Sequence, residues 1–205
     1  MSSVSLSRFQ KRRRIALALL VVIIFIALLF VQSSVTTSGR FHEYLEDLGI
    51  CLIFIAILGR SWCTLYIGGR KSAEIVNTGP YSVTRNPLYV FSTIGAAGVG
   101  AMVGSVTVAV LFAVLTWASF HYVTLVEEDY LKRNFGKPYE DYLARVPRFF
   151  PNFRLFREAE LLTVKPRTLY RTFGDGLVFL LAYPFFEAVE YLQTSGVLPV
   201  LLQLY

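Results

Sequence analysis

The residues best suited to chemistry lie on either side of a long apolar hairpin. The first group is the stretch GPYSVTRNPLY, residues 79–89. Pro87 suits the first position of a helix because proline has no N–H to leave unpaired, and Asn86 before it is disfavoured in helical geometry. The first-turn N–H groups of that helix would then face the aqueous interface, which is a favourable position for a carboxylate. A turn followed by a helix start is the simpler alternative.

The second group is the acidic pair Glu127-Glu128, which follows the hairpin. Acids at the C-terminal end of a helix face the negative end of its dipole, which is unfavourable. Their presence at the edge of the apolar region suggests a cationic partner such as an ammonium or a sulfonium. At 100° per residue, His121, Thr124 and Glu128 share one helix face, whereas Glu127 points elsewhere. A solvated helix end is the alternative interpretation.

Two further features lie close to these groups in the sequence. The stretch FGKPYEDYLARVPRFFP, residues 135–151, places Tyr139 and Tyr142 one helical turn apart, as an aromatic lid would require. Interfacial amphipathicity also explains that pattern. Arg60 interrupts an apolar run, where a charge is costly. It is interpreted either as an interfacial anchor with nearby aromatic residues or as a contact for a bound anion.

The elements that must position these residues are membrane helices. The 205-residue chain is 55% hydrophobic and 15% aromatic with a mean hydropathy of +0.53, and its apolar runs approach the roughly 20 residues that a span requires. We expect one integral membrane domain over residues 1–205. Four core spans are predicted, at Ile15–Val31, Leu48–Ile67, Leu88–Val103 and Val106 to about Val126.

A C-terminal apolar helix, about residues 174–204, follows these spans. Because it carries Pro184, Glu187 and Glu190, a lipid-exposed span is disfavoured, and packing on the bundle or lying in the interface is preferred. The predicted fold is therefore all-α, a multi-pass transmembrane bundle of four core spans plus this helix, spanning or interfacial. The third span is rich in Gly and Ala, which permits either close helix packing or space for a ligand.

The basic residues indicate the topology. All of the 20 Lys and Arg residues except Arg40 and Arg60 fall on one predicted side, which includes the N-terminus. The positive-inside rule makes that side cytoplasmic. The net charge of +6 is thereby explained without nucleic acid, and contact with anionic membrane lipids is expected instead. The first apolar run exceeds a usual signal-peptide core and is expected to be retained.

No metal site is expected from the cysteines. Cys51 and Cys63 fall in one predicted helix, about 18 Å apart by helical rise, which is too far for a disulfide. They also match no metal-binding signature.

Over about residues 49–151 the chain resembles the isoprenylcysteine carboxyl methyltransferase family and its phospholipid N-methyltransferase relatives. The resemblance rests on an ordered set of motifs separated by the hairpin. These are Ile75-Val76-Asn77-Thr78-Gly79-Pro80-Tyr81, Arg85-Asn86-Pro87-Leu88-Tyr89, Glu127-Glu128, Leu131, Phe135-Gly136, Tyr139, Tyr142 and Val146-Pro147.

The resemblance implies that S-adenosyl-L-methionine binds at the cytoplasmic interface. The cofactor-binding residues carried over by motif are Ala73, Glu74, Ile75, Val76, Tyr81, Asn86, Pro87, Leu88, Tyr89, Glu127 and Glu128. Two positions depart from the family pattern. Asn86 stands where His is frequent, which excludes a base there, and Val123 stands where the prenylcysteine enzymes carry a substrate-binding Arg. Arg60, His121 and Arg148 are the weaker substrate-binding candidates, and no catalytic residue is assigned.

The main functional hypothesis is an S-adenosylmethionine-dependent methyltransferase at the cytoplasmic membrane interface. Its small or lipophilic acceptor is expected to enter from the bilayer. Phospholipid amine N-methylation is the alternative within this class, and an NADPH-dependent membrane reductase or a non-catalytic membrane scaffold are the alternatives outside it. The expected location is a bacterial inner membrane, or the endoplasmic reticulum if the source is eukaryotic. Oligomeric state is left open.

Overall fold

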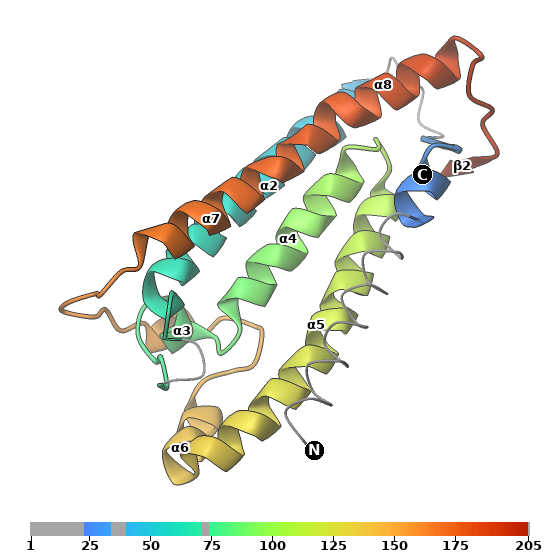
Figure 1. Cartoon of the computed structure of the whole chain (residues 1–205). Coiled ribbons are helices and arrows are strands. Elements are labelled where there is room, and N and C mark those ends of the chain that lie inside the picture. Colours follow the sequence, from blue (N-terminus) through green and yellow to red (C-terminus); the bar gives the residue numbers. More distant parts are fainter. Residues whose placement is uncertain (1–22, 34–39, 71–73, 205) are drawn as a thin grey trace, which may run out of the picture.

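Long apolar helices make up most of the chain and run side by side (Figure 1). The computed structural model describes residues 23–33, 40–70 and 74–204. The long elements are α2 (Arg40–Ile67), α4 (Pro87–Ala101), α5 (Val106–Phe135), and a C-terminal succession of α7 (Pro166–Leu177), η2 (Val178–Leu181) and α8 (Ala182–Thr194).

Shorter elements cap the two ends of these helices. At one end lie α3 (Pro80–Val83), α6 (Lys137–Arg145) and η1 (Phe153–Leu155). At the other end β1 (Val31–Ser33) pairs in parallel with β2 (Leu202–Leu204), with Val31 opposite Leu202. Figure 1 shows these two groups at opposite ends of the molecule.

Glycines bring α2 and α4 into close antiparallel contact. A Cβ built on Gly98 would lie 2.7 Å from the carbonyl oxygen of Gly49, and one on Gly95 would lie 2.9 Å from the Cβ of Ala56. Missing side chains of this kind let membrane helices approach closely and pack by van der Waals contact. The small residues of α4 therefore serve helix packing on this face.

The hairpin from α4 to α5 turns as the sequence predicts. Gly104 has a φ of 70°, a conformation that favours glycine. The Ser105 hydroxyl accepts a hydrogen bond from Val108 N at 3.3 Å and caps α5, as serine at this position commonly does. Gly100 then packs against the backbone of Ala109, where a Cβ would lie 2.7 Å from Ala109 Cα. The two helices are thus antiparallel and closely packed.

The C-terminal helices run antiparallel to α2 along its length (Figure 1). Thr64 Oγ1 donates to Thr172 Oγ1 at 3.3 Å, and a Cβ on Gly176 would lie 3.0 Å from the Ile57 side chain. This arrangement agrees with the expectation of a helix packed on the bundle. The helix ends at Thr194 rather than near residue 204, and Gly196 has a φ of 77°.

The predicted spans need correction at several boundaries. Among the described residues, three helical stretches are long and apolar enough to cross a membrane, namely Arg40–Ile67, Val106–Phe135 and Pro166–Thr194. α4 has only 15 residues and ends at Ala101 instead of Val103, which is shorter than a typical span. α5 continues past Val126 to Phe135, because the acidic and basic residues that follow the apolar run are good helix formers. The count of four core spans is therefore not established.

The fold is mostly helical, as expected, and β1 and β2 add a short parallel pair that the sequence did not predict. Gln193 of α8 donates to the carbonyls of Leu29 and Val31 at 2.9 and 3.1 Å, so it helps to hold the chain that enters β1. Most of the predicted first span, Ile15–Val31, lies outside the described residues. Residues 23–28 are helical, and the last residue of that prediction is in a strand.

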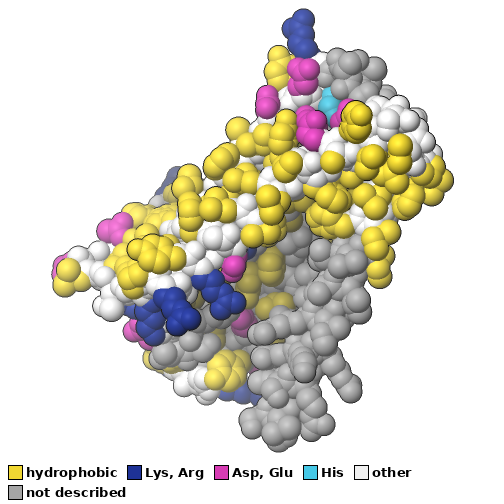
Figure 2. Space-filling model, turned by 45° about the horizontal axis from the view of Figure 1, so that its top comes forward, with side chains coloured by type: hydrophobic (Ala, Val, Ile, Leu, Met, Phe, Trp, Pro, Cys, Tyr) yellow, Lys and Arg dark blue, Asp and Glu magenta, His cyan; other side chains and the backbone are white. Residues whose placement is uncertain are grey.

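Charge is distributed unevenly over the molecule. Figure 2 shows hydrophobic side chains along the helices, with lysines and arginines clustered toward one end. Acidic side chains and a histidine gather at the other end, beside a single basic side chain. This pattern is typical of a membrane protein whose two ends face different aqueous compartments.

Candidate functional site

The two predicted chemical groups meet in one cleft at the basic end of the molecule. We call it the polar cleft, and its walls come from the loop before α3, the start of α4, the end of α5 and α6. Its lining residues are Ile67, Glu74, Ile75, Val76, Tyr81, Arg85, Asn86, Leu88, Tyr89, Glu127, Glu128, Tyr130, Leu131, Tyr139 and Tyr142. Most of the predicted cofactor-binding residues are among them.

Two of those predicted residues are not in the lining. Pro87 is fully buried as the first residue of α4, where it starts the helix. Ala73 lies outside the described residues. Nine of the eleven predicted cofactor-binding residues therefore line one cleft. Pro87 lies behind this lining, at the start of α4.

Gly79 shapes the wall around Tyr81. Its φ of 56° favours glycine, and the Tyr66 ring occupies the space where a Cβ would lie. This turn leads into α3, in which the Tyr81 side chain is only 5% exposed. Its hydroxyl has no hydrogen-bond partner within the described residues. Burial raises the pKa of the Tyr81 hydroxyl well above its usual value, so the group remains a neutral donor into the cleft.

Asn86 joins the start of α4 to the segment that follows α6. Its side-chain N–H donates to the Arg148 carbonyl at 3.1 Å. Two first-turn N–H groups, those of Tyr89 and Val90, already donate to the Asn86 carbonyl at 3.1 and 3.2 Å. The helix start therefore offers a ligand fewer donors than the sequence suggests, and the Asn86 side chain is bound to the protein itself.

The acidic pair divides into two different environments. Glu127 lines the polar cleft and accepts a hydrogen bond from the Tyr89 hydroxyl at 2.8 Å. Tyr89 in turn stacks on Phe120, with ring centroids 4.4 Å apart and planes 14° apart. Glu127 is thus oriented by an aromatic residue that α4 supplies and α5 supports.

Glu128, in contrast, is held by two arginines. Arg148 donates to both of its carboxylate oxygens, at 3.1 and 2.8 Å, and Arg85 approaches Glu128 Oε1 at 3.4 Å. The hydrogen bonds that Arg148 donates to Glu128 raise the pKa of Arg148. This paired geometry ties the end of α5 to the α4 start and to the segment after α6, which indicates a positioning role for Glu128.

Tyr139 and Tyr142 form part of the cleft wall. Tyr142 donates to the Tyr81 carbonyl at 2.8 Å, and both rings are buried, with centroids 5.9 Å apart. Burial raises the pKa of Tyr139 to about 12. The contact with the α3 backbone fixes Tyr142 in place, which fits a wall of the cleft better than an aromatic lid, one of the two interpretations that the sequence left open.

A second, larger space lies among the helices, and we call it the apolar cavity. Its volume is about 580 Å³. α2, α4, α5 and the C-terminal helices contribute mostly aliphatic and aromatic side chains to it, together with Gly95 and Ala96 of α4. The small residues of α4 therefore do both things that the sequence left open, since some permit close packing and others leave room.

Arg60 is the charged residue among the lining of the apolar cavity. It donates from Nη1 to the Ser92 hydroxyl at 2.7 Å, and its Nε has no partner within the described residues. Both residues line the cavity. This position fits the alternative interpretation of a contact with an anionic group, and Asp175 of α7 also acts electrostatically on the guanidinium.

The other two substrate candidates lie elsewhere. His121 lines neither space; its ring packs against Trp117 and Phe149, with centroids 5.3 and 5.7 Å away. Arg148 is occupied by Glu128. Neither residue has the position that a direct contact with a substrate in the apolar cavity requires.

Sequence reasoning missed Phe120, which together with the predicted Tyr89 separates the two spaces. Tyr89 lines the polar cleft, whereas its stacking partner Phe120 lines the apolar cavity. The aromatic pair is therefore a shared wall. A signal was present, because Phe120 lies seven residues before Glu127 and so falls on the same helix face.

Comparison with known proteins adds an independent finding. The family model described as phospholipid methyltransferase matches residues 13–138. A nickel-cobalt-cadmium resistance protein of Alcaligenes xylosoxydans xylosoxydans is 36% identical over 95% of this chain and 91% of its own length. A cobalt-zinc-cadmium resistance protein of Cupriavidus metallidurans is 33% identical over 95% of this chain and 89% of its own length.

A third relative connects the chain to an enzyme. Protein-S-isoprenylcysteine O-methyltransferase B of Arabidopsis thaliana is 30% identical over 73% of this chain and 80% of its own length. No solved structure matches. The matched segments include α2, α4 and α5, which build both spaces.

Proposed function

This chain belongs to the phospholipid methyltransferase family, and on that basis we propose that it transfers a methyl group from S-adenosylmethionine to a lipophilic acceptor in the membrane. The supporting observation is the juxtaposition of two unlike spaces. A polar cleft with a carboxylate adjoins an apolar cavity of about 580 Å³, and the stacked Tyr89 and Phe120 rings separate them. A soluble cofactor suits the first space and an amphiphile suits the second.

The polar cleft contains groups that fit this cofactor. Glu127 offers a carboxylate to an ammonium, and the unpartnered hydroxyl of Tyr81 offers a buried donor. Ile75, Val76 and Leu131 provide apolar surface for an adenine ring. When bound, S-adenosylmethionine would supply an electrophilic methyl group on a charged sulfonium.

Because no base is assigned, the protein's remaining contribution is to align the acceptor with the cofactor and to exclude water. Helices α2, α4 and α5 hold the acceptor in an apolar cavity, where its nucleophile is desolvated. Arg60 and Ser92 would bind an anionic part of that acceptor. Orientation of this kind supplies much of the rate when two reactants meet in one site. An acceptor that is already deprotonated, such as a carboxylate, needs no base.

Two relatives named for resistance to transition metals favour a second proposal, which concerns the role of the reaction in the cell. In that proposal, methylation of a membrane component supports tolerance of nickel, cobalt or cadmium. It uses the same site and adds a physiological purpose. Growth of cells that carry an inactive form of the chain on graded nickel concentrations measures this role directly.

Transfer of labelled methyl into a native membrane extract tests the proposed reaction. The full-length protein in detergent receives S-adenosylmethionine with a labelled methyl group, and the product is separated into lipid, prenyl-thiol and protein fractions. We expect label in a lipophilic fraction. Label on an amine headgroup would identify the phospholipid alternative.

Cofactor binding separates the remaining alternatives. Labelled S-adenosylmethionine and NADPH are added separately to the same purified protein. Binding of NADPH alone would favour a membrane reductase, and binding of neither would favour a non-catalytic scaffold. Either result would overturn the methyltransferase proposal.

A further inference from the structure

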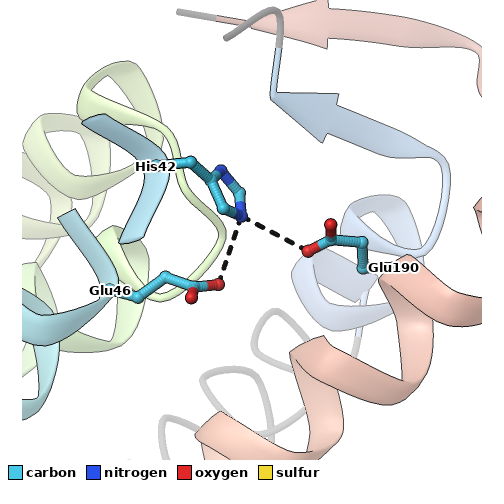
Figure 3. Close-up of side chains that lie close together, drawn as sticks. All are labelled: His42, Glu46 and Glu190. Carbon is cyan, nitrogen blue, oxygen red and sulfur yellow. Dashed lines mark hydrogen bonds and ion pairs between the residues drawn. The ribbon is translucent and has the colours of Figure 1, made fainter. Parts of the chain in front are cut away.

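A histidine and two glutamates converge at the end of α2 that lies opposite the polar cleft. His42 occupies the first turn of α2, Glu46 follows one turn later, and Glu190 comes from α8. Figure 3 shows both carboxylates directed at the same imidazole nitrogen. The cluster joins residues 148 positions apart in sequence, so no local sequence motif indicates it.

The distances match those between neighbouring ligands of one metal ion. His42 Nε2 lies 3.2 Å from Glu46 Oε1 and 3.3 Å from Glu190 Oε2. Metal–ligand bonds of about 2.0–2.2 Å place adjacent ligand atoms of a tetrahedral site roughly 3.3–3.6 Å apart. One donor atom from each of the three residues also lies within 4.8 Å of the others. Small side-chain adjustments are enough to close such a triangle on an ion.

His42 is buried and held in place. Its side chain is 6% exposed, and the ring packs over Gly104, where any Cβ would collide with it. Its Nδ1 has no hydrogen-bond partner in the part of the chain that the structure describes. A polar ring that is buried at such cost and fixed with Nε2 facing two carboxylates is arranged as a metal ligand is.

The surrounding charge favours a cation. Asp47 and Glu187 lie close enough to act electrostatically on Glu46, in addition to Glu190. A divalent ion bound among these carboxylates would balance two of their negative charges. Figure 2 shows the same excess as acidic side chains gathered around a histidine at this end.

We propose that His42, Glu46 and Glu190 bind a divalent first-row transition-metal ion, such as Zn²⁺ or Co²⁺. Imidazole with carboxylates suits ions of this borderline class better than Mg²⁺ or Ca²⁺, which prefer oxygen ligands alone. Three protein ligands leave a coordination position for water. This site is separate from the polar cleft, and it revises the expectation from the cysteines that the chain carries no metal site.

Zinc binding to the full-length protein tests the proposal. The protein is purified in detergent through an affinity tag without histidines, stripped with a chelator and titrated with Zn²⁺ by calorimetry. We expect about one ion per chain. Glu190→Gln should weaken binding at least as much as the loss of an outer-shell partner does, about 10- to 100-fold. Glu43→Gln, an exposed acid of the same helix turn, is the matched control and should bind as the wild type does.

Melting temperatures with and without zinc distinguish the loss of zinc binding from the poor folding of a variant. An ion that binds only the native state stabilises it by an amount that grows with the logarithm of the ratio of free ion to the dissociation constant, and so raises the melting temperature. Added Zn²⁺ should raise the melting temperature of the wild type and of Glu43→Gln, and at the same zinc concentration should raise that of Glu190→Gln by less. A wild type that neither binds nor is stabilised would overturn the proposal and leave a hydrogen-bonded clamp between α2 and α8. Equal zinc affinity in Glu190→Gln and the wild type would overturn it as well.

Discussion

Glu127 and Glu128 are adjacent in sequence but have different interaction partners. Glu128 is 7% exposed and lies between two guanidinium groups, whereas Glu127 faces the polar cleft and is oriented by the Tyr89 hydroxyl. Successive residues on a helix point about 100° apart, so Glu128 reaches the two arginines whereas Glu127 reaches the Tyr89 hydroxyl. We therefore assign the contact with a cofactor ammonium to Glu127.

The variant Glu127→Gln tests this assignment. It keeps the size of the side chain and its bond from Tyr89 but removes the charge that would bind an ammonium. A hydrogen bond to a charged group contributes about 1.5–3 kcal/mol, so S-adenosylmethionine binding should weaken by roughly tenfold or more. Equilibrium binding of the labelled cofactor to purified protein is the measurement.

Glu140→Gln is the matched control for that experiment, because Glu140 is an exposed acid in the first turn of α6. Its affinity for the cofactor should stay within about twofold of the wild type, as expected for a surface charge. If both variants bind the cofactor as tightly as the wild type, Glu127 does not contact the ammonium.

At the residue scale, the sequence grouped residues that lie together in the cleft, but it did not predict which of their side chains pair with one another. The motif positions Tyr81, Tyr89 and Glu127 lie together in the lining of the cleft, and their contact with a cofactor stays a prediction. The pairing of Glu128 with Arg148 crosses 20 residues and a helix break at Gly136. Such a contact depends on the angle between α5 and α6, which local pattern does not determine. The cluster of His42, Glu46 and Glu190 was not predicted either, because it depends on how α2 packs against α8.

At the scale of elements, contact between α2 and α4 decides where the cleft and the cavity lie. The backbones approach so closely at Gly98 and Gly49 that a Cβ on either would lie within 2.8 Å of the facing carbonyl oxygen. Neighbouring Gly95 also lines the apolar cavity. The register of these two helices therefore fixes both the packing and the shape of the cavity.

The variant Gly98→Ala should destabilise this contact. Its new methyl group meets backbone atoms of α2, which cannot rotate away, and overpacking of this kind costs about 1–3 kcal/mol. The melting temperature of the purified protein, followed by circular dichroism, should fall. Gly174→Ala in α7 is the control, because nothing lies within 4 Å of the added carbon and alanine favours the helix. A melting temperature for Gly98→Ala at or above that of the control would contradict the proposed contact.

Element boundaries were predicted less well than element types. Apolar composition identified α2, α4 and α5, because a helix is the natural way to bury backbone groups in lipid. It placed the end of α5 too early, since the polar residues after Val126 remain helical up to Gly136. The strands β1 and β2 were missed because each has three residues and pairs with a partner about 170 residues away.

At the scale of the whole molecule, the two candidate sites occupy opposite ends of the same helix. Ile67 at the end of α2 lines the polar cleft, whereas His42 at its beginning belongs to the proposed metal site. A helix of 28 residues is about 42 Å long, which exceeds the thickness of the hydrocarbon core. If α2 crosses the membrane, the two sites face different aqueous compartments.

Labelling from one side of the membrane tests that arrangement. The basic residues cluster at the end that carries the polar cleft, so the positive-inside rule places this end in the cytoplasm and the His42 end outside. Glu43→Cys, at the exposed start of α2, should react in intact cells with a maleimide that does not cross membranes. Glu140→Cys, on α6, should react only after the cells are permeabilised. Unmodified protein sets the background, because Cys63 is buried and Cys51 lies within the apolar part of α2. Labelling of both positions from outside would place the cleft and the metal site on one face, and a cytoplasmic cofactor would then no longer have access to Glu127.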